Sequence, residues 1–205
     1  MQLIMQVWRN SMNIDEAKSL YLYYYGSEFL MCREDEKKWA EFRELKISAD
    51  VREKWRQELI DKLFSRSAVE VDNRWVYFDT LIDVLIKSTS KREENCYRLL
   101  DWMSRLDCLN EMEATVITET MAGRSANFSN GAVKFICENS KLIDDFEGII
   151  CRINKVASIE DVSDNTKLSI NERKRNALIS FKKAVEMYSR ADERRKKWNK
   201  LKIWT

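Results

Sequence analysis

The sequence predicts an all-α protein, and three observations lead to that class. Apolar residues recur at spacings of three and four along almost the whole 205-residue chain. The chain has no proline and only four glycines, whereas β-sandwiches and barrels need frequent Gly and Pro turns. No alternating strand pattern of useful length competes with the helical one. We therefore expect roughly eight or nine helices, packed as antiparallel hairpins and ending in a long C-terminal helix.

The first helices are located by their caps and their apolar faces. Asn13 is a typical N-cap residue and opens a helix that the Gly26-Ser27 step interrupts. Residues 1–11 lie ahead of this opening and are expected to be a loosely attached extension. Ser48 opens a further helix, and its apolar positions recur at helical spacing. They are Val51, Trp55, Leu59, Leu63 and Phe64.

The middle of the chain is divided by regularly spaced capping residues. Candidate caps stand at positions 72, 90, 110, 129 and 145, which predicts short loops and antiparallel neighbours. Two such helices approach the ~40-residue period of HEAT-like or armadillo-like repeats. No residue signature repeats at that period, so a short helical array and an irregular bundle both stay open. Three capping boxes are predicted here and further on, pairing Ser90 with Glu93, Asn110 with Glu113, and Ser169 with Glu172.

The C-terminal helix is expected to dock on the rest of the chain. We divide the sequence into a helical-hairpin body, residues 1–168, and this helix, residues 169–205, within one domain overall. Positions 171–205 contain twelve Lys or Arg against four acidic residues, whereas 1–170 contain 24 basic and 30 acidic residues. The apolar stripe of the helix predicts core packing. It comprises Ala177, Phe181, Ala184, Tyr188, Ala191 and Trp198.

Three cations near the start of this helix call for an acidic partner. Arg173, Lys174 and Arg175 would stand in the first turn, where the helix dipole opposes positive charge by about 0.3–1 kcal/mol. The acidic segment 144–164 of the chain itself is the favoured partner, and an external phosphate or acidic ligand is the alternative. At the other end, the dipole itself favours positive charge. A nucleic-acid surface there would use Arg194, Arg195 and Trp198.

A run of aromatic residues is the most unusual local feature. The stretch Tyr21-Leu-Tyr-Tyr-Tyr-Gly-Ser27 is followed closely by Phe29. Consecutive aromatic residues exceed what one buried helix face can absorb, so at least one ring should be partly exposed. Partly exposed Tyr and Trp are typical of contact surfaces. An ordinary aromatic core, with hydroxyl groups reaching solvent, is the favoured interpretation of this run. The alternative is a contact surface, whose predicted partner-binding residues are Tyr23, Tyr24, Tyr25 and Phe29.

Most enzyme mechanisms lack their residues in this chain. Without histidine there is no Ser-His or Cys-His pair and no His-ligated metal, and no glycine-rich phosphate loop is present. Asp79 and Asp83 share a helix face and could serve a carboxylate-based, metal-dependent enzyme. Lys87 follows Asp83 by four residues, so a solvated ion pair is the simpler explanation. No small-molecule cofactor is expected.

The cysteines indicate a reducing compartment. There are five, an odd number without a C-x-x-C pair, which favours free thiols in the cytoplasm over disulfides or zinc. Cys96, Cys137 and Cys151 lie in apolar helical patterns as small buried residues. Residues 1–8 are too short for a signal peptide. No stretch approaches the ~20 apolar residues of a membrane span, so no membrane partner is expected.

These observations favour a non-enzymatic helical interaction protein that binds a protein partner in a scaffold or regulatory role. The first alternative is nucleic-acid binding through the basic C-terminal helix. An acidic remainder and a formal net charge of only +2 count against it. The weaker alternative is the carboxylate enzyme built on Asp79 and Asp83.

Overall fold

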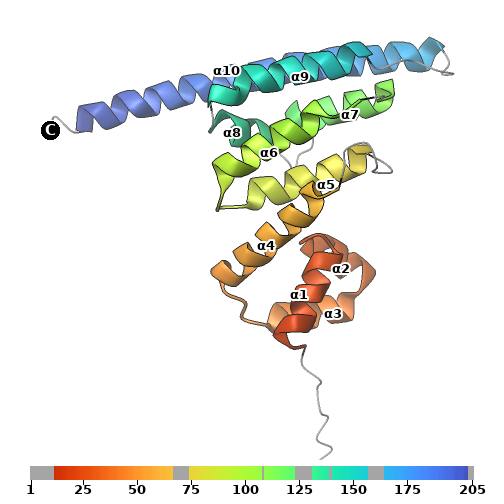
Figure 1. The fold of residues 1–205 in the computed structure, drawn as a ribbon, viewed down its shortest axis with the longest axis vertical. Coiled ribbons are helices and arrows are strands. Elements are labelled where there is room, and N and C mark those ends of the chain that lie inside the picture. Colours follow the sequence, from red (N-terminus) through yellow and green to blue (C-terminus); the bar gives the residue numbers. More distant parts are fainter. Residues whose placement is uncertain are drawn as a thin grey trace, which may run out of the picture. The chain divides into compact units, whose positions relative to one another are not determined.

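The structure is a computed structural model that describes residues 12–66, 74–107, 109–122, 131–138, 140–156 and 164–202. In these ranges the chain forms ten α-helices, one short 3₁₀-helix and no strand, so the all-α prediction is confirmed (Figure 1). No helix in the described ranges is both long and apolar enough to cross a membrane. The helices are α1 (Ile14–Tyr23), α2 (Glu28–Glu34), α3 (Glu36–Glu44), α4 (Ala49–Phe64), α5 (Arg74–Lys87), α6 (Arg92–Ser104), α7 (Glu111–Ala122), α8 (Gly131–Cys137), η1 (Ser140–Leu142), α9 (Ile143–Val156) and α10 (Asp164–Lys202).

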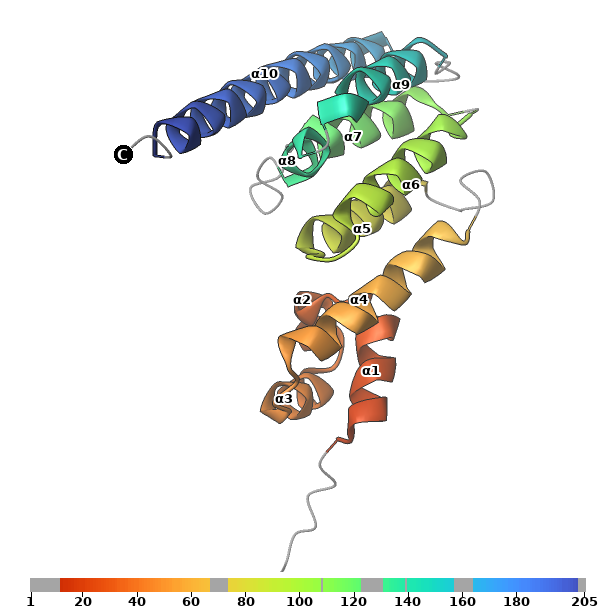
Figure 2. The same ribbon diagram turned by 60° about the vertical axis from the view of Figure 1, so that its left-hand side comes forward.

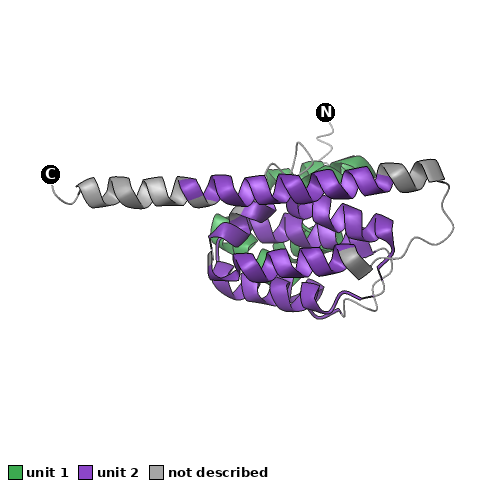
Figure 3. Cartoon of the chain, turned by 90° about the horizontal axis from the view of Figure 1, so that it is seen from above, with its two compact units in different colours: residues 1–59 green, residues 60–205 purple. Residues whose placement is uncertain are grey.

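The chain divides into two compact units, coloured separately in Figure 3. The first comprises residues 1–59 and the second residues 60–205, so the boundary falls inside α4. The sequence predicts a boundary between residues 168 and 169, ahead of the C-terminal helix. In the structure that helix is α10, and it packs against α7 and α8 within the second unit. The extension 1–11 lies outside the described residues.

The first unit contains α1, α2, α3 and the first part of α4, whose ribbons Figure 2 shows from a second side. The chain breaks into more helices here than expected, because Asp35 ends α2 and caps α3 at once. Its carboxylate accepts a hydrogen bond of 3.0 Å from the Lys38 backbone amide. The buried core of this unit includes Ala17, Tyr21, Met31, Phe42, Trp55 and Leu59.

The second unit is organised around α7, which packs against α5, α8, α9 and α10. Figures 1 and 2 both show α7 and α8 between α5 and α10, and α6 contacts α9 directly. Because α7 is covered from several directions, it buries polar as well as apolar side chains. The buried polar residues of α7 are Glu111, Thr115, Thr118 and Glu119. The choice between an irregular bundle and a repeat array stays a prediction.

The last helix, α10, begins at Asp164, five residues ahead of the position that the sequence indicated. Ser169 therefore lies inside the helix, and the predicted Ser169–Glu172 capping box is wrong. The apolar stripe is correct as far as the described side chains reach. Ala177, Phe181 and Ala184 are buried, at the predicted steps of four and three. Tyr188 is half-buried.

The other predicted caps have mixed outcomes. Asn13 caps α1, and the Asn110–Glu113 box forms, with both reciprocal hydrogen bonds between 2.9 and 3.1 Å. The Ser90–Glu93 box is wrong, because Lys91 takes the N-cap position of α6 in a left-handed conformation (φ 50°). Asp145 lies within the first turn of α9 instead of capping it. The predicted caps at 72 and 129 lie outside the described residues.

Candidate functional site

The turn between α1 and α2 positions the aromatic residues of the first unit. Tyr25 and Gly26 both have positive φ, 52° and 70°, and the Gly26 amide donates a 2.8 Å hydrogen bond to the Tyr21 carbonyl. A Cβ at position 26 would stand 2.7 Å from the Tyr21 hydroxyl oxygen, closer than real Cβ atoms come. Glycine is therefore required here. The Ser27 hydroxyl then accepts from the Leu30 amide at 3.3 Å and caps α2.

We call residues 23–29 the aromatic segment, and several of its rings face solvent. Tyr23 is 74% exposed, Phe29 72% and Tyr25 38%. Tyr24 is half-buried and meets the Tyr23 ring edge-on, with 4.9 Å between the ring centroids. The expectation that at least one ring stays exposed is confirmed. Tyr21, which begins the run, is buried beside Trp55.

A groove of about 820 Å³ adjoins the aromatic segment within the first unit. Tyr23 and Tyr24 line it together with residues of α1 and α3. Its charged lining consists of three carboxylates and one ammonium group. The ammonium, that of Lys38, pairs with Asp35 at 3.1 Å. Two hydrogen bonds from Lys38, the one from its backbone amide first, lower the pKa of Asp35. The three carboxylates belong to Asp15, Glu16 and Glu41.

The cations near the start of α10 meet partners inside the second unit. Arg173 donates from Nε and Nη2 to the two carboxylate oxygens of Glu119, at 3.1 and 2.9 Å. The Glu119 side chain is only 8% exposed, and its hydrogen bond raises the pKa of Arg173. Lys174 Nζ lies 3.9 Å from Glu111 Oε1. Because α10 begins at Asp164, neither cation stands in its first turn, so the expected dipole penalty does not apply.

The acidic partners of Arg173 and Lys174 come from α7, so assigning them to the segment 144–164 was wrong. That segment does supply one partner, since Lys182 Nζ lies 2.7 Å from Glu147 Oε1. Arg175 is exposed. The predicted site residues Arg194, Arg195 and Trp198 lie on the helical backbone of α10, but their side chains are outside the described part of the structure.

The two carboxylates on α5 are engaged separately. Lys87 Nζ contacts Asp83 Oδ2 at 2.7 Å, which confirms the predicted ion pair. The Thr120 hydroxyl donates a hydrogen bond to Asp79, and burial raises the pKa of this carboxyl group. No group of three or more His, Cys, Asp or Glu side chains suited to a metal ion occurs among the described residues.

The described cysteines at 32, 96, 137 and 151 are free thiols. Burial raises the pKa of Cys96 to about 12 and that of Cys137 to about 11, so both thiols stay protonated at neutral pH. Cys96 is buried as predicted, whereas Cys137 and Cys151 are only half-buried. Neither Cys96 nor Cys137 therefore has the low pKa of a nucleophilic cysteine.

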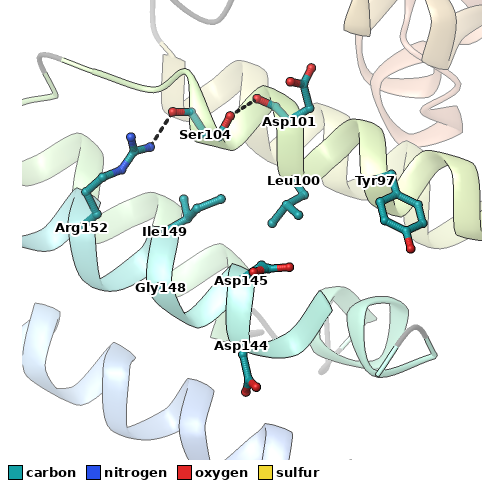
Figure 4. A pocket seen from close by; sticks show the side chains of 9 residues that line it. All are labelled: Tyr97, Leu100, Asp101, Ser104, Asp144, Asp145, Gly148, Ile149 and Arg152. Carbon is teal, nitrogen blue, oxygen red and sulfur yellow. Dashed lines mark hydrogen bonds between the residues drawn. The ribbon is translucent and has the colours of Figure 1, made fainter. Parts of the chain in front are cut away.

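A second groove, of about 800 Å³, lies between α6 and α9 and was not expected from the sequence (Figure 4). Arg152 stands at one end and donates to the carbonyl oxygens of Met103 and Ser104, at 3.3 and 2.7 Å, at the C-terminus of α6. The pair of adjacent aspartates in α9 is the only sequence signal that points here. The lining residues are Tyr97, Leu100, Asp101 and Ser104 from α6, and Asp144, Asp145, Gly148, Ile149 and Arg152 from α9.

No protein-family model matches the chain, and comparisons with curated proteins and with solved structures find no significant match. The structure is that of an all-α protein with an exposed aromatic segment in the first unit and a groove with acidic residues between α6 and α9 in the second. The cations Arg173, Lys174 and Lys182 of α10 already pair with carboxylates of the second unit.

Proposed function

We propose that this protein is a non-enzymatic, helical interaction protein that binds a protein partner through its aromatic segment. One observation carries the proposal. Tyr23 and Phe29 are 74% and 72% exposed, although the same unit buries Tyr21, Phe42 and Trp55. Large aromatic side chains dominate the energetics of protein interfaces, because they bury much area with few rotatable bonds.

The backbone supports this role because it holds the aromatic segment in place. Tyr25 adopts positive φ although it is a bulky residue, a conformation that costs of order 1–3 kcal/mol and that clusters at functional sites. The adjoining groove gives a partner side chain a place to enter beside Tyr23 and Tyr24. A partner segment with an apolar or aromatic anchor fits this surface best. We place the interaction in the cytoplasm, as the free cysteines favour.

The nucleic-acid alternative receives less support from the same geometry. Arg173, Lys174 and Lys182 already face the carboxylates of Glu119, Glu111 and Glu147. A phosphate would have to displace these pairs. We therefore propose that these three cations stabilise the fold through their ion pairs and do not bind a ligand.

The proposal is tested by the double variant Tyr23→Ser/Phe29→Ser in affinity purification from the native cell. We expect a partner protein to be recovered with the unchanged chain and lost with the double variant. The matched control is Val76→Ser on α5, whose side chain is 44% exposed and should leave recovery unchanged. Recovery of the same partner by the double variant would refute the proposal. A bound nucleic acid that survives the double substitution would favour the alternative.

A further inference from the structure

The groove between α6 and α9 combines an apolar floor with acidic rims. Leu100 and Ile149 are half-buried in its floor, and Tyr97 stands at its side with 45% of its surface exposed. In Figure 4 the Asp145 carboxylate lies in the space between the two helices. Asp144 and Asp101 also line the groove, and in Figure 4 their carboxylates point away from the space between the two helices.

The charge of these rims is only partly balanced within the second unit. Asp101 pairs with Arg105, and Arg152 is bound to the end of α6. Asp144 and Asp145 make no ion pair with another described residue. They stabilise the first turn of α9, yet they leave the groove with net negative charge. A cationic, amphipathic segment is the complementary ligand.

Nothing in the second unit requires a glycine at position 148, which lies in the same groove. It lies in the interior of α9, where glycine is less favourable than alanine by roughly 0.5–1 kcal/mol. A Cβ at this position would meet nothing within 4 Å. Glycine is the residue that allows another backbone to approach closely. Its place in the groove therefore fits a second helix lying against α9.

The chain itself contains a segment with the matching chemistry. Residues 190–202 of α10, which we call the basic arm, hold seven Lys or Arg and two acidic residues. Figure 1 shows this end of α10 extending past the other helices of its unit. In the sequence, Trp198 and Leu201 are three residues apart and Arg194 precedes Trp198 by four, which is the spacing of an amphipathic, cationic helix.

We propose that the groove between α6 and α9 binds the basic arm of a second copy of this chain. In Figures 1 and 2 this end of α10 extends away from α6 and α9, so we expect the arm to meet the groove of another molecule and not its own. Each copy has one arm and one groove, and a pair of copies can exchange arms or a longer chain can form. This surface is separate from the aromatic segment, so the two proposals stand or fall independently.

The test is the molar mass of the full chain in solution, measured by light scattering after gel filtration across concentration and salt. We expect assemblies larger than the 24.5 kDa monomer at low salt, and dissociation as salt rises. Asp144→Lys/Asp145→Lys and Arg194→Glu/Arg195→Glu should each be monomeric. Mixing these two variants should restore assembly in pairs, because the unchanged basic arm of the groove variant then meets the unchanged acidic groove of the arm variant.

The matched control is Glu36→Lys/Asp50→Lys, which makes the same charge change at two exposed first-turn residues and should assemble like the unchanged chain. Circular dichroism of every variant confirms that it is folded. A monomeric unchanged chain at all salt concentrations would overturn the proposal. So would an assembly that both charge-reversed variants keep, or a mixture that stays monomeric.

Discussion

The first unit leaves two large aromatic side chains largely exposed, whereas the second unit buries charged side chains between α7 and α10. Tyr23 and Phe29 are each more than 70% exposed, while Glu119 is 8% exposed and held by Arg173 at both oxygens. A buried carboxylate is tolerated only with a partner, so the pair of Glu119 with Arg173 needs no external ligand to account for it. The exposed area of an aromatic ring contributes no hydrophobic stabilisation until another molecule covers it.

This difference separates the unusual residues that have partners within the fold from those that remain exposed and can bind another molecule. The basic residues at 173, 174 and 182 form ion pairs within the second unit. The aromatic segment, for which the sequence allows either a core or a contact surface, has three exposed rings. We therefore expect the exposed aromatic segment to bind a partner, and the ion pairs of the second unit to stabilise the fold.

Breaking the buried pair should have the largest effect on stability. Arg173→Glu places a second carboxylate against Glu119 and should lower the free energy of unfolding by about 3 kcal/mol. Urea unfolding followed by circular dichroism measures this loss. The control Arg175→Glu changes an exposed neighbour and should cost less than about 0.5 kcal/mol. Equal losses in the two variants would show that the pair has no special role.

Replacing either of two glycines by alanine should change the free energy of unfolding in opposite directions. Gly26→Ala should lower the free energy of unfolding by about 2 kcal/mol, since φ is 70° and the new Cβ would meet the Tyr21 ring. Gly148→Ala should raise it by about 0.5–1 kcal/mol, because the helix gains alanine in open space. Thermal and urea unfolding of the two variants measure both changes. A neutral Gly26→Ala would contradict the tight turn that holds the aromatic segment.

Asp79→Asn should produce a smaller effect that depends on pH. Burial raises the pKa of this carboxyl group above 3.8, so the folded state binds its proton more tightly than the unfolded chain. Stability is therefore lost as pH rises through the raised pKa. We expect the variant to be more stable than the unchanged chain at neutral pH and to lose that advantage below pH 3.8. The control Asp83→Asn removes the pair with Lys87 and should be slightly destabilising, by about 0.3–0.5 kcal/mol.

The parts of the fold that depend on local pattern could be predicted from the sequence. The buried positions Leu59 and Leu63 in α4, and Ala177 and Phe181 in α10, follow helical spacing. Asn13 also caps α1, because a cap is decided by neighbouring residues. The exposure of the aromatic segment followed from counting more rings than one helix face can bury.

The parts that depend on distant contacts could not be predicted. Glu119 and Arg173 are 54 positions apart, and no local rule pairs them. The start of α10 was misplaced because Ser169 and Glu172 match a capping box although the helix runs through them. The groove between α6 and α9 arises only when two helices that are separate in sequence come together.

Site-specific photo-crosslinking tests most directly whether a partner protein covers the aromatic segment. A photoreactive phenylalanine analogue would replace Tyr23, Phe29 or, as a control, Val76 in the native cell. We predict that positions 23 and 29 crosslink to the same partner protein and that position 76 does not. If 23 and 29 give no more crosslinked product than 76, the aromatic segment is not an interface and the central claim fails.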